Sequence, residues 1–357
     1  MSLKEDILRA FLDWNPELVE KMKNCKHAGE NHYNPYHLEN EIFIHSLLTY
    51  NQADSNDYIQ LIMALCHDIG KVYTREVMES GKVSFFGHSE ASIQDTIDFV
   101  KYLHDNDIID YQQLVFFILH GLPVMSNHTL YYQNLHKGKY IANGDNLMLY
   151  YLEMIGKMDT AGSICKDKKV VDNVDYDEFI EREESIYHPF VYIWAGVPGS
   201  GKDYLAEQNG YPIISFDDIR VRIYKHYIET ETTFDINDFD EDIIYKNAFS
   251  YCNENNIDLN GYLAKEARYY LDKGQNINIC NTSLTRKARR KIINVIGTKY
   301  NYVVKQVFAP SDIIFERNRN RTNKVIPENV IKDMMKRMSI CTYFEKNINK
   351  IYYIFND

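Results

Sequence analysis

The hydrophobic pattern changes character near the middle of the chain. In the first half, apolar residues recur at spacings of three and four, which is typical of amphipathic helices. The predicted helices lie within 3–48 and over 58–66, 89–103, 111–120 and 147–160. Gly121-Leu-Pro123 is expected to end the helix over 111–120. We therefore expect the first half to be all-α.

In the second half, short apolar runs of strand length alternate with helical stretches. Strands are predicted over 190–195, 213–215, 276–280, 302–308 and 351–355. Helices are predicted over 202–209, 217–228, 260–273, 285–298, 311–319 and 327–339. This alternation is typical of βαβ units that build a parallel sheet. The acidic residues within 229–257 are interpreted as an insertion between core elements.

The length supports a division into domains. A chain of 357 residues exceeds the size that a single hydrophobic core usually serves. We expect an all-α domain over 1–162, a polar linker over 163–187, and an α/β domain with a parallel sheet over 188–357.

Composition indicates the location of the protein more than its chemistry. The six cysteines form no CxxC pair, which suits reduced thiols in a cytosol. The sequence has no apolar run of about 18 residues, and its first residues lack the apolar core of a secretory signal. We therefore expect a cytoplasmic protein without a membrane span.

The charge is unevenly distributed along the chain. The formal net charge of −11 argues against broad, nonspecific affinity for nucleic acid. Basic residues nevertheless gather within 286–291 and 317–337, and a local basic groove can hold a polyanion. A solvated helix face explains the run over 286–291 equally well.

A glycine-rich turn follows the first predicted strand of the second half. Gly196-Val-Pro-Gly-Ser-Gly-Lys202 matches the P-loop pattern of a strand, G-x-x-x-x-G-K and a helix. Backbone N–H groups of such a loop face phosphate oxygens, and the lysine adds positive charge. We expect this loop to bind ATP and Mg²⁺. The predicted binding residues are Gly196, Gly199, Ser200, Gly201, Lys202 and Asp203.

Asp203 departs from the P-loop pattern, which has Ser or Thr at this position to contact magnesium. A carboxylate there could coordinate Mg²⁺ directly. It also brings negative charge towards the phosphates, which costs about 4 kcal/mol at ~4 Å and an effective dielectric of ~20. Either magnesium binds tightly or ATP binding is weakened, and the sequence leaves both open.

Two further segments suit phosphoryl transfer. Asp217 follows the second predicted strand and is a candidate general base for an acceptor hydroxyl. Arg220, one helical turn later, is a candidate contact for an acceptor phosphate. Arg317 and Arg321 belong to a basic stretch over 315–327, which is predicted to be a lid that neutralises charge on the triphosphate.

The first half contains a spaced set of histidines and aspartates. His45, the adjacent His67 and Asp68, and Asp159 are candidate metal ligands. Imidazole and carboxylate ligands suit zinc, manganese, iron, cobalt or nickel better than calcium. Such a metal activates water and polarises a phosphoryl oxygen. His88 and His120 could extend the set to a second metal, and His37 is a weaker candidate for substrate contact.

Ala64-Leu-Cys-His-Asp-Ile-Gly-Lys71, preceded by Ile44-His-Ser-Leu-Leu48, strongly resembles the HD superfamily. The segment over roughly 30–162 is similar in particular to the HD domains of bacterial tRNA nucleotidyltransferases. The resemblance implies metal-dependent phosphomonoesterase or 2′,3′-cyclic phosphodiesterase activity, with Asp68 and Lys71 among the catalytic residues. HD enzymes also act on free nucleotides, so the substrate stays open.

The segment over about 189–340 resembles the phage-type 5′-OH polynucleotide kinases, because four separated motifs occur in the same order. The resemblance makes Lys202 the phosphate lysine, Asp217 the general base and Arg220 the acceptor-phosphate contact, with Arg317 and Arg321 in the lid. Asn281-Thr-Ser283 stands where these kinases have D-T-N, so an amide replaces an acidic residue.

Together the halves resemble bacterial HD–polynucleotide kinase fusions that heal broken RNA ends. This implies an all-α HD domain followed by an α/β P-loop kinase, acting on nucleic-acid ends. RNA is favoured over DNA because only RNA has the 2′-OH that forms cyclic phosphates. The sequence has no K-x-D-G ligase motif, so sealing would need a partner RNA ligase.

Two alternatives remain. The chain could combine a nucleotidase with a small-molecule or nucleoside kinase. It could also be an ATP-binding regulatory protein whose P-loop has lost activity at Asp203.

Overall fold

The structure is a computed structural model that describes residues 2–30, 32–166, 174–232, 240–321 and 324–357. The chain forms two compact units. The helical unit contains Met1–Glu181 and Asp333–Phe344, and the sheet unit contains Arg182–Lys332 and Glu345–Asp357. Residues 174–181, within the predicted linker, contact the helical unit, where the Asp177 N–H donates to His136 O at 2.9 Å.

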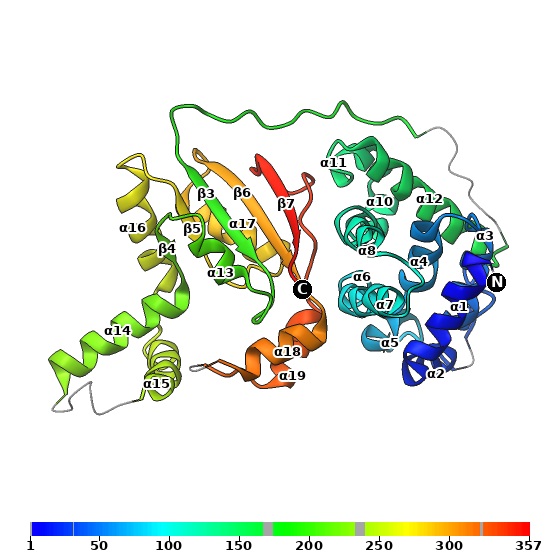
Figure 1. Cartoon of the computed structure of the whole chain (residues 1–357), viewed down its shortest axis with the longest axis horizontal. Helices are drawn as coiled ribbons and strands as arrows, with labels where there is room; N and C mark the ends of the chain where they lie inside the picture. Colours follow the sequence, from blue (N-terminus) through cyan, green and yellow to red (C-terminus); the bar gives the residue numbers. More distant parts are fainter. Residues whose placement is uncertain (1, 31, 167–173, 233–239, 322–323) are drawn as a thin grey trace. The chain divides into compact units, whose positions relative to one another are not determined.

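In the described residues of the helical unit, α-helices of four to 17 residues are accompanied by a hairpin of two-residue strands, β1 (Glu76–Val77) and β2 (Val83–Ser84). Its first helices are α1 (Leu3–Trp14), α2 (Pro16–Asn24), α3 (Ile42–Gln52), α4 (Tyr58–Cys66) and α5 (Lys71–Thr74). There follow α6 (His88–Ala91), α7 (Ile93–Asp105), α8 (Tyr111–Phe116), α9 (Leu122–Ser126), α10 (His128–Gln133), α11 (Gly138–Ile141) and α12 (Asn146–Gly162) (Figure 1). The all-α character predicted for this half is confirmed.

Helix α4 is the centre of this unit. Every residue from Ile59 to Cys66 is buried, as expected for a helix that is apolar on all sides. The Asp57 side chain begins the helix by accepting hydrogen bonds from the N–H groups of Ile59 (3.0 Å) and Gln60 (3.2 Å). The helix packs against α1, α3 and α12. It therefore delivers His67 and Asp68, which follow it directly, into the interior of the unit.

The helix predicted over 111–120 does not stop at Gly121, so that expectation is wrong. A π-helix over Phe117–Gly121 continues α8 directly into α9. Pro123 is the second residue of α9 and follows the π-helix closely. Gly121 is required by packing, because a Cβ there would lie 2.8 Å from the Phe117 ring and 3.2 Å from Ile59.

The described part of the sheet unit contains five parallel strands: β3 (Phe190–Ala195), β4 (Ile213–Ile214), β5 (Ile277–Ile279), β6 (Asn301–Phe308) and β7 (Lys350–Phe355). They lie in the order β4-β5-β3-β6-β7, and the predicted parallel sheet is confirmed (Figure 1). Neighbouring strands end at the same edge, so the segments that follow β3, β4 and β5 meet there. These segments include the P-loop and Asp217.

The helices of the sheet unit are α13 (Lys202–Glu207), α14 (Phe216–Glu231), α15 (Glu241–Glu254), α16 (Leu259–Leu271), α17 (Arg286–Ile296) and α18 (Ser311–Arg319). Helix α19 (Glu328–Met335) begins in this unit, and its residues from Asp333 on are assigned to the helical unit. Helix α15 lies within the segment interpreted as an acidic insertion. It packs against α14, and Ile244, Ala248 and Cys252 form its buried stripe at spacings of four. Residues 233–239, near the start of that segment, lie outside the described residues.

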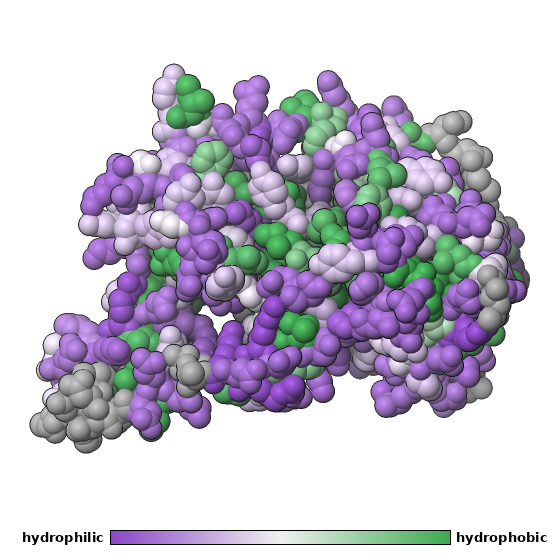
Figure 2. All heavy atoms as spheres, viewed as in Figure 1, coloured by the Kyte–Doolittle hydropathy of each residue, from purple (hydrophilic) through white to green (hydrophobic). Residues whose placement is uncertain are grey.

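Polar side chains cover most of the face of each unit seen in Figure 2, and apolar side chains appear between them in small groups. Among the described residues, none of the helices combines the length and the apolar character needed to cross a membrane.

Candidate functional sites

The P-loop joins the end of β3 to the start of α13. Gly199 and Gly201 have φ angles of 91° and 87°, in the left-handed region that favours glycine. A Cβ on Gly199 would also lie 2.5 Å from the backbone oxygen of Ile314. The Gly196 N–H donates to Thr282 O at 3.0 Å and fixes the start of the loop. The result is a backbone loop without side chains at the positions where phosphates approach closely.

The remaining P-loop side chains fit the phosphates of ATP. Lys202 is buried, and its Nζ lies 3.1 Å from Asp203 Oδ2. The Asp203 side chain is 53% exposed and can offer a carboxylate oxygen, the ligand type that Mg²⁺ prefers. Ser200 Oγ is buried and has no hydrogen-bond partner among the described residues. A buried hydroxyl in this position fits a phosphate or metal-bound oxygen.

Asp217 lies in the first turn of α14. The Ser215 hydroxyl caps this helix by accepting a hydrogen bond from the Asp218 N–H at 3.1 Å. Asn281, at the end of β5, accepts a hydrogen bond from the Phe216 N–H at 2.9 Å. The amide that replaces the expected acidic residue therefore fixes the start of the helix that carries Asp217.

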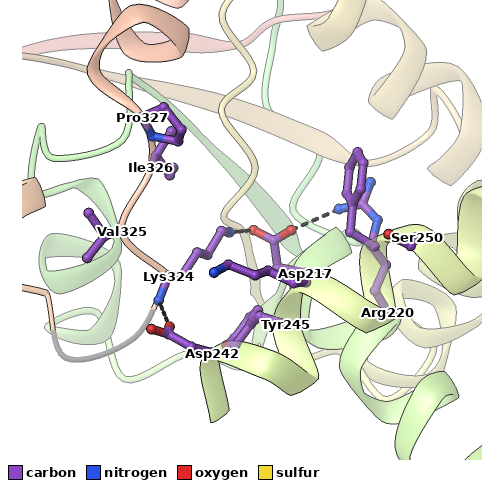
Figure 3. A pocket seen from close by; sticks show the side chains of 11 residues that line it. Asp217, Arg220, Asp242, Tyr245, Ser250, Lys324, Val325, Ile326 and Pro327 are labelled. Carbon is purple, nitrogen blue, oxygen red and sulfur yellow. Dashed lines mark hydrogen bonds and ion pairs between the residues drawn. The ribbon is translucent and has the colours of Figure 1, made fainter. Parts of the chain in front are cut away.

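The Asp217 carboxylate lies between two cations. Its Oδ1 accepts a hydrogen bond from Arg220 Nη1 at 2.8 Å, and its Oδ2 forms an ion pair with Lys324 Nζ (Figure 3). The Arg220 guanidinium lies over the rings of Phe249 (5.2 Å) and Phe216 (6.0 Å). Burial lowers the pKa of Arg220, but the group remains a cation at neutral pH.

These groups line a pocket of about 500 Å³ in the sheet unit (Figure 3). One wall comes from α14 and α15, and the other from the chain segment 324–327. The lining residues are Asp217, Arg220, Asp242, Tyr245, Lys246, Phe249, Ser250, Lys324, Val325, Ile326 and Pro327. Apolar and aromatic groups thus stand beside a candidate base and several cations.

The two predicted lid arginines lie at different places. Arg317 donates from Nη1 to Asn356 O (3.0 Å) and from Nη2 to Asp357 O (3.2 Å), so its guanidinium is held at the carboxyl end of β7. The Asn356 side chain in turn donates to the P-loop oxygen of Ser200 at 2.7 Å. Arg321 is half-buried just beyond α18, beside residues 322–323, which lie outside the described part.

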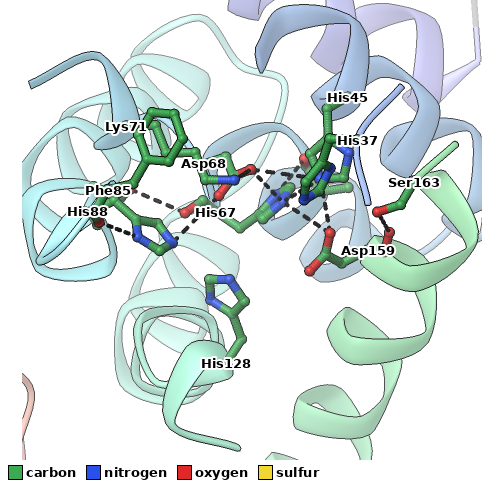
Figure 4. A network of polar contacts seen from close by, with 12 residues as sticks. His37, His45, His67, Asp68, Lys71, Phe85, His88, His128, Asp159 and Ser163 are labelled. Carbon is green, nitrogen blue, oxygen red and sulfur yellow. Dashed lines mark hydrogen bonds and ion pairs between the residues drawn. The ribbon is translucent and has the colours of Figure 1, made fainter. Parts of the chain in front are cut away.

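In the helical unit, six side chains converge in a histidine–aspartate cluster: His45, His67, Asp68, His88, His128 and Asp159 (Figure 4). His45, His67 and Asp159 offer three ligand atoms within 4.8 Å of one another, as do Asp68, His88 and His128. Asp68 Oδ2 lies 3.6 Å from His45 Nε2, and Asp68 Oδ1 lies 3.6 Å from His88 Nε2. Asp68 therefore faces both groups.

Three histidines of the cluster, His67, His88 and His128, are oriented in the same way. The Nδ1 atoms of His67, His88 and His128 lie 3.0, 2.8 and 2.6 Å from the carbonyl oxygen three residues earlier in the chain. A carbonyl only accepts hydrogen bonds, so Nδ1 carries the proton and Nε2 keeps its lone pair for a metal. His45 Nδ1 likewise lies 2.9 Å from Glu39 Oε1, and its Nε2 lies 2.8 Å from Asp159 Oδ1.

The protonation states of most side chains in the cluster also suit metal binding. Burial lowers the pKa of His67 and His128 and lowers that of His88 to about 4, so these imidazoles are neutral at pH 7. Burial opposes ionisation of Asp68, but Lys71, whose Nζ lies 2.6 Å from Oδ2, and the histidines hold its pKa well below the ordinary value. Neutral imidazoles and ionised carboxylates are the forms that bind metal.

His45 differs from the other histidines of the cluster. Burial opposes its protonation, but hydrogen bonds with Asp159 and Glu39 raise its pKa to about 9. The Tyr132 hydroxyl donates to Asp159 Oδ2 at 3.0 Å and fixes the other carboxylate oxygen. Within the described residues, the cluster offers one group of ligand atoms on each side of Asp68 that could hold a divalent transition metal, and His45 would have to lose its Nε2 proton to take part.

The structure does not bring His120 to the cluster. Its ring packs against Phe116, with centroids 4.4 Å apart, and its Nδ1 lies 4.0 Å from Asp145 Oδ2. His128 takes the place for which His120 was expected. His37 lies beside the cluster, with its ring centroid 4.9 Å from that of His45 and its Nδ1 2.9 Å from Glu39 Oε1.

Residues 191–340 match the family described as an AAA domain, which covers less than half of the chain. The matched residues include the P-loop, and the side chains of this loop fit the phosphates of ATP and a Mg²⁺ ion. None of the curated proteins compared matches the chain.

Among solved structures, a sugar kinase from Janibacter sp. HTCC2649 is 15% identical, with a TM-score of 0.30, over 46% of this chain and 84% of that one. A gluconokinase from Sinorhizobium meliloti 1021 is 15% identical, with a TM-score of 0.29, over 47% and 83%.

Proposed function

We propose that the protein is a bifunctional enzyme that heals nucleic-acid ends, RNA more readily than DNA. The sheet unit phosphorylates 5′-OH ends with ATP, and the helical unit hydrolyses 2′,3′-cyclic or terminal phosphates with bound metal. A separate RNA ligase would then seal the ends.

The position of Asp217 carries the kinase half of this proposal. Its carboxylate opens into the pocket beside the P-loop edge of the sheet, where it can accept the proton of a 5′-hydroxyl. Arg220 is available for the phosphate of the acceptor strand. The apolar wall formed by Tyr245, Phe249 and Val325 suits the flat face of a nucleobase, because bases stack on aromatic and apolar side chains.

The histidine–aspartate cluster carries the hydrolase half. Metals such as Mn²⁺, Ni²⁺, Co²⁺ or Zn²⁺, bound there, would polarise a phosphoryl oxygen and activate water. Asp68 stands between the two ligand groups, and Lys71 offsets its charge. His37 is positioned by Glu39 at the edge of the cluster, where it can donate to a substrate oxygen.

The acceptor class is tested by competition. The full chain is given labelled ATP with a 5′-OH oligoribonucleotide in the presence of excess 3′-mononucleotide or of a hexose. Preferential labelling of the oligonucleotide is expected. Labelling of the small molecules alone would establish the small-molecule kinase instead, and ATP binding without any turnover would establish a regulatory protein.

Asp203→Ser tests the unusual P-loop position. Removing the carboxylate lowers repulsion towards the phosphates and restores the usual hydroxyl, so half-maximal phosphorylation should occur at lower Mg²⁺ concentration. The measurement is a Mg²⁺ titration of both proteins with a 5′-OH oligonucleotide. Identical curves would mean that Asp203 has no role at the metal, and activity only in the variant would mean that the natural protein binds ATP without using it.

A further inference from the structure

Lys324 is neither the candidate base nor the acceptor contact, yet it reaches the centre of the candidate kinase site. Its Nζ forms an ion pair with Asp217 Oδ2, opposite the Arg220 contact (Figure 3). Its backbone N–H donates to Asp242 Oδ1, and its φ of 59° lies in the left-handed region, which a lysine rarely adopts. The backbone is therefore held in one unusual conformation that directs the side chain inward.

The charges around Lys324 come from the P-loop as well as from the base. Its side chain is 35% exposed, and the Tyr245 ring centre lies 5.7 Å from Nζ. Burial and the charge of Lys202 lower the pKa of Lys324 to about 8, and Asp203 partly opposes this. The Lys324 ammonium therefore contacts Asp217 and is also close enough to Lys202 and Asp203 for their charges to change its pKa.

Orientation of the base does not require this second cation. Arg220 already binds Asp217 Oδ1 and is itself held over two aromatic rings. A second cation on a proton acceptor lowers its affinity for the proton, which works against a base. A cation between the base and the P-loop is useful where negative charge gathers on a phosphoryl group during transfer.

We propose that Lys324 is a catalytic residue whose ammonium contacts the γ-phosphoryl group as it passes from ATP to the acceptor. The inference rests on the proposed kinase activity. The acceptor oxygen forms a bond to the γ-phosphorus and gives its proton to Asp217. The bond from that phosphorus to the bridging oxygen breaks, and the electron pair leaves with ADP. Lys324 keeps its proton and offsets charge on the transferring oxygens.

The first test compares ATP and ADP binding to the full chain in the presence of Mg²⁺, so it needs no acceptor. Lys324→Met is expected to weaken ATP binding about tenfold, the effect of one charged hydrogen bond, and to leave ADP binding unchanged. Lys324→Arg should keep most of the ATP preference. Lys265→Met, at an exposed position of α16, is the matched control.

The second test is the pH dependence of kcat. Activity of the natural protein should fall as pH rises through about 8, because Lys324 then loses its proton. Lys324→Arg should remain active there, since a guanidinium stays charged. The groups that face Lys324 are Asp217 and Arg220 on α14, Asp242, Tyr245 and Lys246 on α15, and Lys202 and Asp203 at the P-loop.

The outcomes separate the two proposals. An unchanged ratio of ATP to ADP affinity in Lys324→Met overturns the role of Lys324, whatever the acceptor. If Lys324→Met loses the preference for ATP over ADP while the natural protein phosphorylates no 5′-OH end, the role of Lys324 is supported and the end-healing function is overturned. A natural protein that binds ATP no better than ADP, or binds neither nucleotide, also overturns the role of Lys324.

Discussion

Asp68→Asn is expected to abolish phosphohydrolase activity while ATP-dependent phosphorylation continues. The substitution keeps the shape of the side chain but removes the charge that faces both ligand groups of the cluster, and it leaves the Lys71 ammonium, 2.6 Å away in the natural protein, without its partner. The measurement is hydrolysis of a 2′,3′-cyclic phosphate end with Mn²⁺, Ni²⁺ or Co²⁺, beside a kinase assay on the same preparation. Full hydrolase activity in Asp68→Asn would refute the metal assignment.

Two histidine variants provide the control for this prediction. His128→Ala should lose bound metal and hydrolase activity, because His128 is fully inside the cluster. His120→Ala should retain both, because its ring packs on Phe116 outside the cluster. Metal content measured on purified protein decides between them, and loss of metal in His120→Ala alone would reverse the assignment.

Asp217→Asn is expected to lower kinase activity by ~10²–10⁴-fold, the usual contribution of a positioned base. The amide keeps the shape and can still contact Arg220, but it cannot accept the proton of the hydroxyl. Initial rates with a 5′-OH oligonucleotide and saturating ATP measure the loss. Lys202→Ala should also suppress the reaction, with weakened use of ATP.

Asp218→Asn is the matched control for Asp217. Asp218 is exposed, and its Oδ2 accepts a hydrogen bond from the Ser215 hydroxyl at 2.6 Å, which is a capping role. Its removal should leave the rate within a few-fold of the natural protein. A large loss in Asp218→Asn and none in Asp217→Asn would transfer the role of base to Asp218.

The features that the sequence predicted best depend on local patterns. The five strands and the P-loop follow from apolar runs and glycine spacing over a few residues, and the structure contains them within one or two residues. Asp217 and Arg220 were recognisable because a strand end and one helical turn bring them together. Helix α15 was missed even though its buried stripe at 244, 248 and 252 is visible in the sequence, because the acidic composition suggested an insertion.

Other features depend on tertiary geometry that spacing does not encode. The chain forms a π-helix over Phe117–Gly121, which includes His120, and His128 rather than His120 faces the cluster. Glu39, in the loop just before α3, orients His45 through a contact of 2.9 Å with its Nδ1. Lys324 reaches Asp217 across 107 residues of sequence through an unusual backbone conformation.

One RNA substrate tests most directly whether a single chain heals both ends. An oligoribonucleotide with a 5′-OH and a 2′,3′-cyclic phosphate is incubated with the protein, ATP, Mg²⁺ and Mn²⁺, and both ends are identified by mass spectrometry. We expect a 5′-phosphate together with an opened or removed cyclic phosphate, with Asp217→Asn losing only the first change and Asp68→Asn only the second. The end-healing function would be contradicted if both RNA ends remain unaltered while the same protein phosphorylates or hydrolyses small molecules.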